Sequence, residues 1–208
     1  MQSETDPKDQ RPISFIEQAR RDQIIAAAAE TVAAVGYAHA SLARIATTAG
    51  ISKGVVTYHF RSKDEILRLV VTRFFDQAWA YMEPRITAEA TAVEQIKMWI
   101  RTELEYFGSH RTEFLAMSDI VANHRDAEGD HAFANEFEEE VSGLTDLLLQ
   151  GQHDGQLRDF DVVSVANIIL RCLEGVLTSW ALDSSVNLDD QIPVLLDFID
   201  HAIGADCP

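Results

Sequence analysis

The chain has 208 residues, 47% hydrophobic and 25% charged, a composition typical of a soluble globular protein that is long enough to bury a core. Its net charge of −17 argues, taken as a whole, against a nucleic-acid binder. Two cysteines, Cys172 and Cys207, exclude a disulfide framework, and a polar N-terminus without an apolar run indicates neither a signal peptide nor an anchor, so we expect a cytoplasmic protein.

Helix signals dominate the N-terminal part of the chain. A capping box at Ser14 and Glu17 predicts a first helix, and Gly36 is its expected C-cap. Ser41 and Ser52 are N-caps of two short helices. These two helices are expected over residues 42–49 and 53–59.

The rest of the chain predicts further helices and no strands. Pro84 is expected to end the first of them, which begins after a capping box at residues 62–65. The expected helices span residues 63–79, 91–107, 111–123, 130–152, 162–182 and 188–203. We therefore predict an all-α fold of about nine helices, with a flexible arm at 1–13, an N-terminal three-helix domain at 14–62 and a larger helical domain at 63–208.

The helix expected at 162–182 is apolar in 14 of its 21 residues. A helix that is apolar around most of its circumference is buried on more than one side, and Arg171 and Glu174 near its centre argue against a membrane span. Its polar residues form one narrow stripe. That stripe fits a solvated edge or an interface network, and lining of a pocket is the alternative. Its members are Ser164, Asn167, Arg171, Glu174 and Thr178.

Residues 41–67, SLARIATTAGISKGVVTYHFRSKDEIL, contain the most informative motif. Two short helices meet at Gly50 and Ile51, which gives the helix–turn–helix geometry that places a second helix in the major groove. The outer face of the second helix offers hydrogen-bond donors and small residues and carries no acidic residue. The residues predicted to contact DNA are Ser41, Arg44, Ser52, Lys53, Gly54, Val56, Thr57, Tyr58, His59 and Lys63. For Val56, packing inside the domain is the alternative.

The distribution of charge supports this interpretation. Residues 11–63 contain seven basic and three acidic side chains, a net charge of +4, whereas residues 64–208 carry −19. A basic segment attracts phosphates, and an acidic remainder disfavours wrong orientations on DNA.

The same segment resembles the DNA-binding domain of the tetracycline-repressor (TetR) family. The resemblance covers roughly residues 15–70, about a quarter of the chain, and one departure is Thr57, where the family often has tyrosine. The matching features are Arg21, Ile24 to Ala28, Gly36-Tyr37, Ser41 to Ala46, Ala49 to Gly54, Tyr58-His59-Phe60 and Ser62 to Leu67.

The resemblance implies a ligand-responsive transcriptional regulator, a repressor in our interpretation, that binds a pseudo-palindromic double-stranded DNA operator as a homodimer. It also implies a small-molecule effector, which we expect to be lipophilic, and dimerisation through the last two helices. The residues expected at the dimer interface are Val165, Ile169, Leu173, Val176, Leu195, Phe198 and Ile199. No membrane is expected as a partner.

The expected ligand pocket lies among the middle helices, where Glu103 is an acid on an apolar face. With aromatic neighbours it would hold a lipophilic cation, and packing of these aromatics in the core is the alternative. The predicted ligand contacts are Trp99, Glu103, Tyr106, Phe114, Met117, Phe137, Glu174 and Trp180.

No nucleophile motif, phosphate loop or glycine fingerprint is present, so we expect no cofactor and no enzyme. Histidines at 110, 124, 131 and 153 do not repeat at ligand spacing, so no metal is expected either. Three alternatives stay open: a DNA-binding dimer that senses no small molecule, an activator, and a helical hydrolase or lyase.

Overall fold

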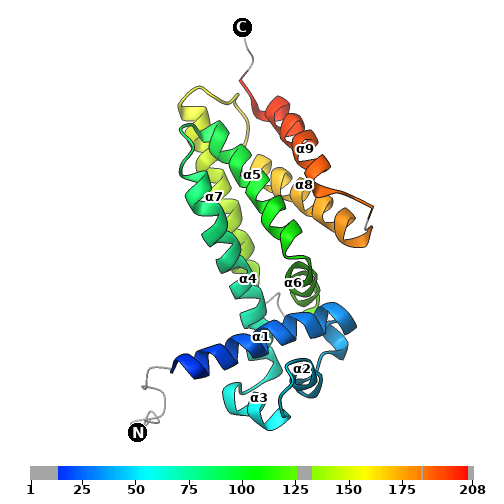
Figure 1. Ribbon diagram of the computed structural model, residues 1–208. Helices are drawn as coiled ribbons and strands as arrows, with labels where there is room; N and C mark the ends of the chain where they lie inside the picture. Colours follow the sequence, from blue (N-terminus) through cyan, green and yellow to red (C-terminus); the bar gives the residue numbers. More distant parts are fainter. Residues whose placement is uncertain (1–13, 126–132, 184, 206–208) are drawn as a thin grey trace.

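The computed structural model describes residues 14–125, 133–183 and 185–205. These residues form nine α-helices, one short 3-10 helix and no strand (Figure 1). The all-α prediction is therefore confirmed. We call residues 14–62 the head and the described residues from Lys63 onward the body.

The head begins and ends its helices where the sequence predicts. Ser14 and Glu17 form the complete capping box, and Gly36 ends the first helix with a φ of 81°. Gly50 turns the chain between the next two helices at a φ of 67°, in the left-handed region that favours glycine. The head contains α1 (Phe15–Val35), η2 (Tyr37–His39), α2 (Leu42–Thr48) and α3 (Lys53–His59).

The body helices also begin close to the predicted positions, because Ser62, Thr91, Asp161 and Asn187 each cap one of them through a side-chain oxygen. They are α4 (Lys63–Ile86), α5 (Ala92–Ser109), α6 (Arg111–Asn123), α7 (Ala134–His153), α8 (Val162–Leu182) and α9 (Leu188–Ile203). The predicted start of α7 at residue 130 lies outside the described residues.

The prediction that Pro84 ends α4 is wrong. The helix continues through Pro84 to Ile86. Pro84 removes one hydrogen bond close to the end of the helix. The helix still closes with the bond from the Thr87 N–H to the Glu83 carbonyl, at 2.9 Å.

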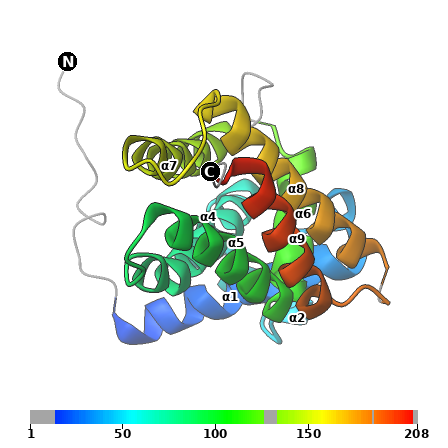
Figure 2. The same ribbon diagram turned by 90° about the horizontal axis from the view of Figure 1, so that it is seen from above.

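Helix α4 leaves the head and runs up through the body, so that it belongs to both (Figure 1). Below, α1 packs against α4 and α6. Above, α5 lies at the centre of the body and contacts α4, α7, α8 and α9 (Figure 2). One continuous cluster of buried apolar side chains runs from Ile24 in the head to Ile203 in α9. Head and body therefore share a core.

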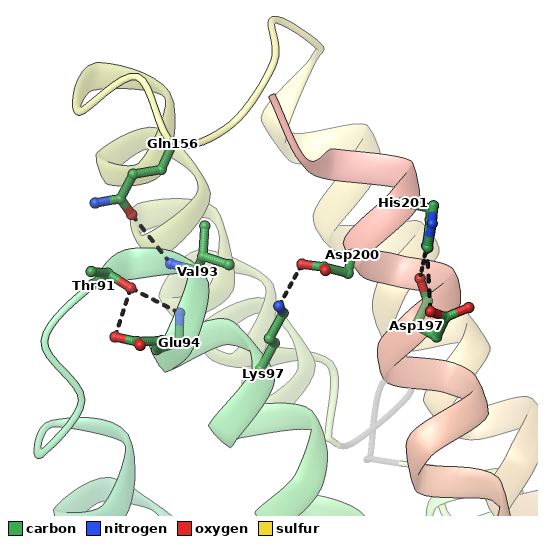
Figure 3. A network of polar contacts seen from close by, with 8 residues as sticks. All are labelled: Thr91, Val93, Glu94, Lys97, Gln156, Asp197, Asp200 and His201. Atoms are coloured by element: carbon green, nitrogen blue, oxygen red, sulfur yellow. Dashed lines mark hydrogen bonds and ion pairs between the residues drawn. The ribbon is translucent and has the colours of Figure 1, made fainter. Parts of the chain in front are cut away.

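Polar contacts fix the upper end of α5 to the segments around it (Figure 3). The Lys97 ammonium lies 2.5 Å from a carboxylate oxygen of Asp200 on α9. The Val93 N–H donates to the side chain of Gln156, in the α7–α8 connection, at 3.4 Å. These contacts hold α5, the α7–α8 connection and α9 together at the end of the body opposite the head.

Helix α8 is long and apolar enough to cross a membrane by length and composition alone, yet only 28% of its most apolar window is buried within the chain. Its inner side packs against α5, α7 and α9. Its outer side carries the ion pair between Arg171 and Glu174 near the middle of the helix. Exposed apolar side chains lie on α8 and on α9: Ile168 (57% exposed), Val194 (64%) and Phe198 (58%), together with Val163 and Leu182.

Candidate functional site

The first candidate site is the outer surface of α3. Lys53, Thr57 and Tyr58 are exposed there, and the Tyr58 side chain is 76% exposed. The Thr57 hydroxyl donates to backbone carbonyls of its own helix. Tyr58 and Lys53 therefore offer the outward-facing polar groups of this surface.

The predicted caps also stand at this surface. The hydroxyls of Ser41 and Ser52 accept hydrogen bonds from the backbone of Arg44 and Val55, each at 3.3 Å. Arg44 is exposed and donates to the carbonyl of His39. Ser41 and Ser52 therefore cap the N-termini of α2 and α3.

The prediction that Val56 faces DNA is wrong. Its side chain is fully buried in the head, at 0% exposure, so it cannot reach a base. Helical spacing turns Val56 inward while the next two residues face out. Val56 therefore packs inside the domain, as the alternative interpretation held.

Lys63 and His59 were predicted to contact DNA, but both side chains are partly buried. The Lys63 ammonium donates to the carbonyl of Tyr37 at 2.9 Å and lies 4.5 Å from the centre of the Tyr37 ring. Burial, followed by the charge of Arg21, lowers the pKa of His59. His59 is therefore uncharged at pH 7 and offers hydrogen bonds without positive charge.

Arg21 holds the end of α3 in place. Its guanidinium donates to the carbonyl of His59 at 2.5 Å, lies 4.1 Å from the centre of the Phe60 ring and reaches Glu65 at 3.4 Å. Arg21, one of the residues that carry the family resemblance, therefore helps to position α3.

The second candidate site is a cavity of about 630 Å³ between α4, α5 and α7. Its walls combine aromatic rings with four carboxyl groups. The lining residues are Thr72, Phe75, Asp76, Ala78, Trp79, Met82, Trp99, Glu103, Phe107, Glu139, Glu140 and Gly143. At Gly143 an added Cβ would lie 3.1 Å from the Trp99 ring, so the glycine lets α7 approach the indole closely.

A smaller cavity of about 240 Å³ adjoins the first and shares four of its lining residues, Phe75, Glu103, Phe107 and Glu140. It extends toward α6 and α8. Its further lining residues are Phe114, Met117, Ser118, Val121, Ala122, Leu170, Arg171, Glu174, Leu177 and Thr178.

Glu103, which is buried, and Glu140, which is partly exposed, both lie where the two cavities meet. Glu103 is 4% exposed and accepts a hydrogen bond from the Trp99 indole N–H at 3.0 Å. Burial and then the nearby Glu140 raise the pKa of Glu103 well above its usual value. Burial also raises the pKa of Glu140 to about 7, with Arg171 lowering it and Glu174 raising it. Both groups therefore hold protons more strongly than exposed carboxyls do.

The structure separates the predicted ligand contacts into those that line a cavity and those that do not. Tyr106 and Trp180 line neither: Tyr106 stacks on His110, and Trp180 packs on Phe114 beneath the Arg111 guanidinium. Their aromatic character reflects packing, and the prediction for them is corrected. Trp99 and Glu103 line the larger cavity, and Glu103, Phe114, Met117 and Glu174 the smaller one. The side chain of Phe137 lies outside the described residues.

Part of the predicted dimer interface is interior. Ile169, Leu173 and Ile199 are buried within the chain, at 2%, 0% and 2% exposure, and Leu195 is nearly so. They cannot meet a partner, because the apolar spacing that drew attention to them marks the core face of each helix. Val165 and Val176 are half-buried, and Phe198 is exposed.

Several cavity residues were missed from the sequence. Trp79 and Asp76 on α4, and Glu139 and Glu140 on α7, were not among the predicted contacts. A signal existed for Glu140, which stands three residues after Phe137 and four before Leu144 on the predicted inner face of its helix. The contribution of α4 required knowledge of which helices meet.

Within the described residues, no group of three histidine, cysteine, aspartate or glutamate side chains is arranged to hold a metal ion. His131 and Cys207 lie outside those residues. His124 is buried, and its Nδ1 forms a hydrogen bond with the Tyr37 hydroxyl at 3.0 Å.

Comparisons with known proteins agree with these features. The family described as bacterial regulatory proteins, tetR family, matches residues 24–70. The fatty acid metabolism regulator protein of Bacillus subtilis is 24% identical over 164 residues, covering 77% of this chain and 83% of that protein. The regulator BetI of Ectopseudomonas mendocina is 48% identical over 48 residues, but this covers only 23% of the chain and 24% of BetI.

Solved structures show the same fold over nearly the whole chain. A transcriptional regulator from Saccharomonospora viridis in complex with choline superposes with a TM-score of 0.74 at 22% identity, covering 90% of this chain and 98% of that one. The matching family and the curated relatives are DNA-binding transcriptional regulators and not enzymes. The family match over residues 24–70, the curated relatives and the solved structures together support a TetR-family regulator.

We predict that stability depends on pH through Glu140. Its pKa rises from about 4.5 in the unfolded chain to about 7 in the fold, so the folded state binds the extra proton between these values and stability falls as pH rises through them. Replacing Glu140→Gln removes this loss. The gain in unfolding free energy relative to wild type should grow by roughly 2 kcal/mol from pH 5 to pH 8, as measured by urea denaturation.

The matched control is Glu138→Gln, which changes an exposed carboxyl on the same helix that lines neither cavity. Its effect should be nearly the same at both pH values. A Glu140→Gln effect that does not change with pH would show that the carboxyl titrates normally.

Proposed function

We propose that this protein is a ligand-responsive repressor that binds a pseudo-palindromic operator as a homodimer in the cytoplasm and leaves it when a small molecule occupies the cavity. The observation that carries the proposal is that the two helices joined to the head, α4 and α6, also line the two cavities. A molecule bound between α4, α5, α6 and α7 would therefore act on the elements that hold the head.

The proposed contact surface for DNA is the exposed side of α2 and α3. Lys53, Thr57 and Tyr58 lie on it, with Ser41, Arg44, Ser52 and Gly54 around them. Lys53 carries its charge at the first residue of α3, where the helix N-terminus adds backbone donors for phosphate. Lys63 and His59 are peripheral in this proposal, because the first is bound to Tyr37 and the second is uncharged.

The proposed dimer forms through the outer faces of α8 and α9. Ile168, Val194 and Phe198 are exposed there, and such apolar side chains gain stability when a second copy covers them. A twofold pair would present two α3 helices to two half-sites. The interface we propose therefore contains Phe198 and the exposed edge of Val165 and Val176, together with Ile168 and Val194.

One residue of η2, Tyr37, bonds three groups of the body. The Tyr37 N–H donates to the Asp119 carboxylate of α6 at 2.6 Å, the Tyr37 carbonyl accepts from Lys63 of α4, and its hydroxyl bonds His124. Residues on the other side of α6, including Met117 and Val121, line the smaller cavity. A shift of α6 or α4 on ligand binding would therefore change the position of the head. In energetic terms the ligand must prefer the state that does not bind DNA.

The names of relatives do not select the effector. One relative is named for fatty acid metabolism, and one structural neighbour is in complex with choline. A regulator without an effector and an activator are the alternatives to a ligand-released repressor. The two cavities favour a ligand, and repressor names occur among the relatives.

Replacing Lys53→Ala should weaken operator binding and reduce the slope of log affinity against log salt by about one unit if the ammonium contacts a phosphate. The operator would be selected from genomic fragments by the purified protein and measured by fluorescence anisotropy at several salt concentrations. Lys97→Ala is the control, because it removes the same charge from the far end of the body. An unchanged affinity and slope would remove Lys53 from the interface. Wild-type binding without sequence preference would contradict the proposed function.

Replacing Phe198→Asp should dissociate the dimer, because the new carboxylate would be buried without a partner. Sedimentation velocity should show a monomer that keeps the helical circular-dichroism spectrum. Leu149→Asp changes an exposed leucine on α7, outside the proposed interface, and should remain dimeric. A Phe198→Asp protein that sediments as the wild type does would place the interface elsewhere.

Operator binding should change the fluorescence of the tryptophans in the cavity, since coupling between two sites acts in both directions. All three tryptophans lie in the body, at positions 79, 99 and 180. In a Trp180→Phe background, the signal comes from the two that line the larger cavity. Adding Asp119→Ala should reduce the change, because the head then loses its hydrogen bond to α6.

The control for that substitution is Asn123→Ala, which removes a hydrogen bond to Asp119 from within α6 and leaves the carboxylate that accepts from the Tyr37 N–H. It should preserve most of the signal. No change in emission with saturating operator would mean that head and cavity are not coupled.

A further inference from the structure

The larger cavity carries charge of one sign. Asp76 on α4, Glu103 on α5, and Glu139 and Glu140 on α7 line it, and no lysine, arginine or histidine occurs among its described lining residues. Four carboxyls around one cavity create a negative potential there. A ligand with a carboxylate or phosphate would be repelled when these groups are ionised.

The same walls supply aromatic faces. Phe75, Trp79, Trp99 and Phe107 line the cavity, and the Trp79 and Trp99 rings lie 5.4 Å apart between centres, at 57° to one another. The electron-rich faces of indoles attract cations, most strongly where water is excluded. Aromatic rings beside carboxyls therefore favour a molecule that is both apolar and positively charged.

The one basic residue near the carboxyls is shared between two of them, because it lowers the pKa of Glu140 and also pairs with Glu174. Arg171 on α8 lines the smaller cavity and pairs with Glu174, one turn along its own helix, at 2.5 Å. The described α6 residues that line that cavity carry no charge. The groups that face Glu103 and Glu140 are thus Asp76, Glu139 and Glu174 on the acidic side and Arg171 alone on the basic side.

Buried carboxyls without a cation are unfavourable in the empty protein. Burial raises the pKa of both Glu103 and Glu140, which means that their charged forms are destabilised where they stand. A cation in the cavity would remove that penalty. A neutral ligand would leave it in place.

We propose that the effector is an organic cation with an apolar body, such as a quaternary ammonium or phosphonium compound, whose positive charge lies against Glu103 and Glu140 and whose apolar groups lie against Trp79 and Trp99. This proposal names the ligand class for the cavity and rests on the proposed function.

The direct test is binding of two ions of nearly the same shape and opposite charge, tetraphenylphosphonium and tetraphenylborate. Isothermal titration calorimetry and quenching of tryptophan emission with the full-length protein should show tetraphenylphosphonium binding at least tenfold more tightly. Equal affinities, or tighter binding of tetraphenylborate, would overturn the proposal.

Substitutions locate the charge that is recognised. Glu103→Gln and Glu140→Gln keep the size of each side chain and should each weaken tetraphenylphosphonium binding about tenfold or more. Glu138→Gln removes an exposed carboxyl on the same helix as Glu140, outside the lining of either cavity, and should leave binding unchanged. If all three variants bind as the wild type does, the cation is not held by this pair.

A second measurement needs no substitution. A cation bound beside the pair favours the ionised carboxyls, so binding should release protons near pH 6.5 and tighten as pH rises from 5.5 to 8. Calorimetry in two buffers of different ionisation enthalpy counts the protons. Binding that takes up protons, or that does not depend on pH, would contradict the arrangement.

Release from the operator is measured separately, by anisotropy of labelled operator during the same titration. Tight, charge-selective binding without release would support the ligand class and contradict the proposed regulation. Release by a neutral or anionic compound that competes with tetraphenylphosphonium would support the regulation and contradict the ligand class.

Discussion

The structure depends on how one short segment joins the head to the body. Every polar group of Tyr37 is used: its N–H bonds α6, its carbonyl accepts from the first residue of α4, and its hydroxyl bonds the buried His124. Gly36 precedes it with a φ of 81°, where a side chain would be strained and an added Cβ would lie 3.6 Å from the Asp119 carboxylate. This joint couples the head to the two helices that line the cavities.

The buried carboxyls show a second constraint, a balance between stability and function. A pair of apolar residues at positions 103 and 140 would pack against Trp99 and Phe107 without a desolvation penalty. The chain instead places Glu103 almost completely out of water, with one indole N–H as its hydrogen-bond partner. These carboxyls destabilise the fold when the cavity is empty, and a ligand that relieves their desolvation penalty stabilises it. The occupied state is therefore favoured relative to the empty one.

The sequence predicted local structure well because local signals set it. The predicted caps at Ser14, Ser41 and Ser52 each mark a helix start. Prediction from the sequence failed where the outcome depended on contacts between segments that are distant along the chain. Pro84 looks the same in the middle or in the last turn of a helix, and only the fold shows how far α4 continues. Helical spacing marked the inner face of α8 but could not tell the core of one chain from an interface, so Ile169 and Leu173 were misplaced.

The same reasoning explains why the cavity was only half found. Trp99 and Glu103 stand on one face of one helix, one turn apart, and their pairing is visible in the sequence. Trp79 and Glu140 reach the cavity from helices 20 or more residues away along the chain. The BetI match covers only 48 residues, 23% of this chain, so that relative does not supply the missing part. The choice of ligand therefore has to be read from the charges and rings that α4, α5 and α7 bring together in this chain.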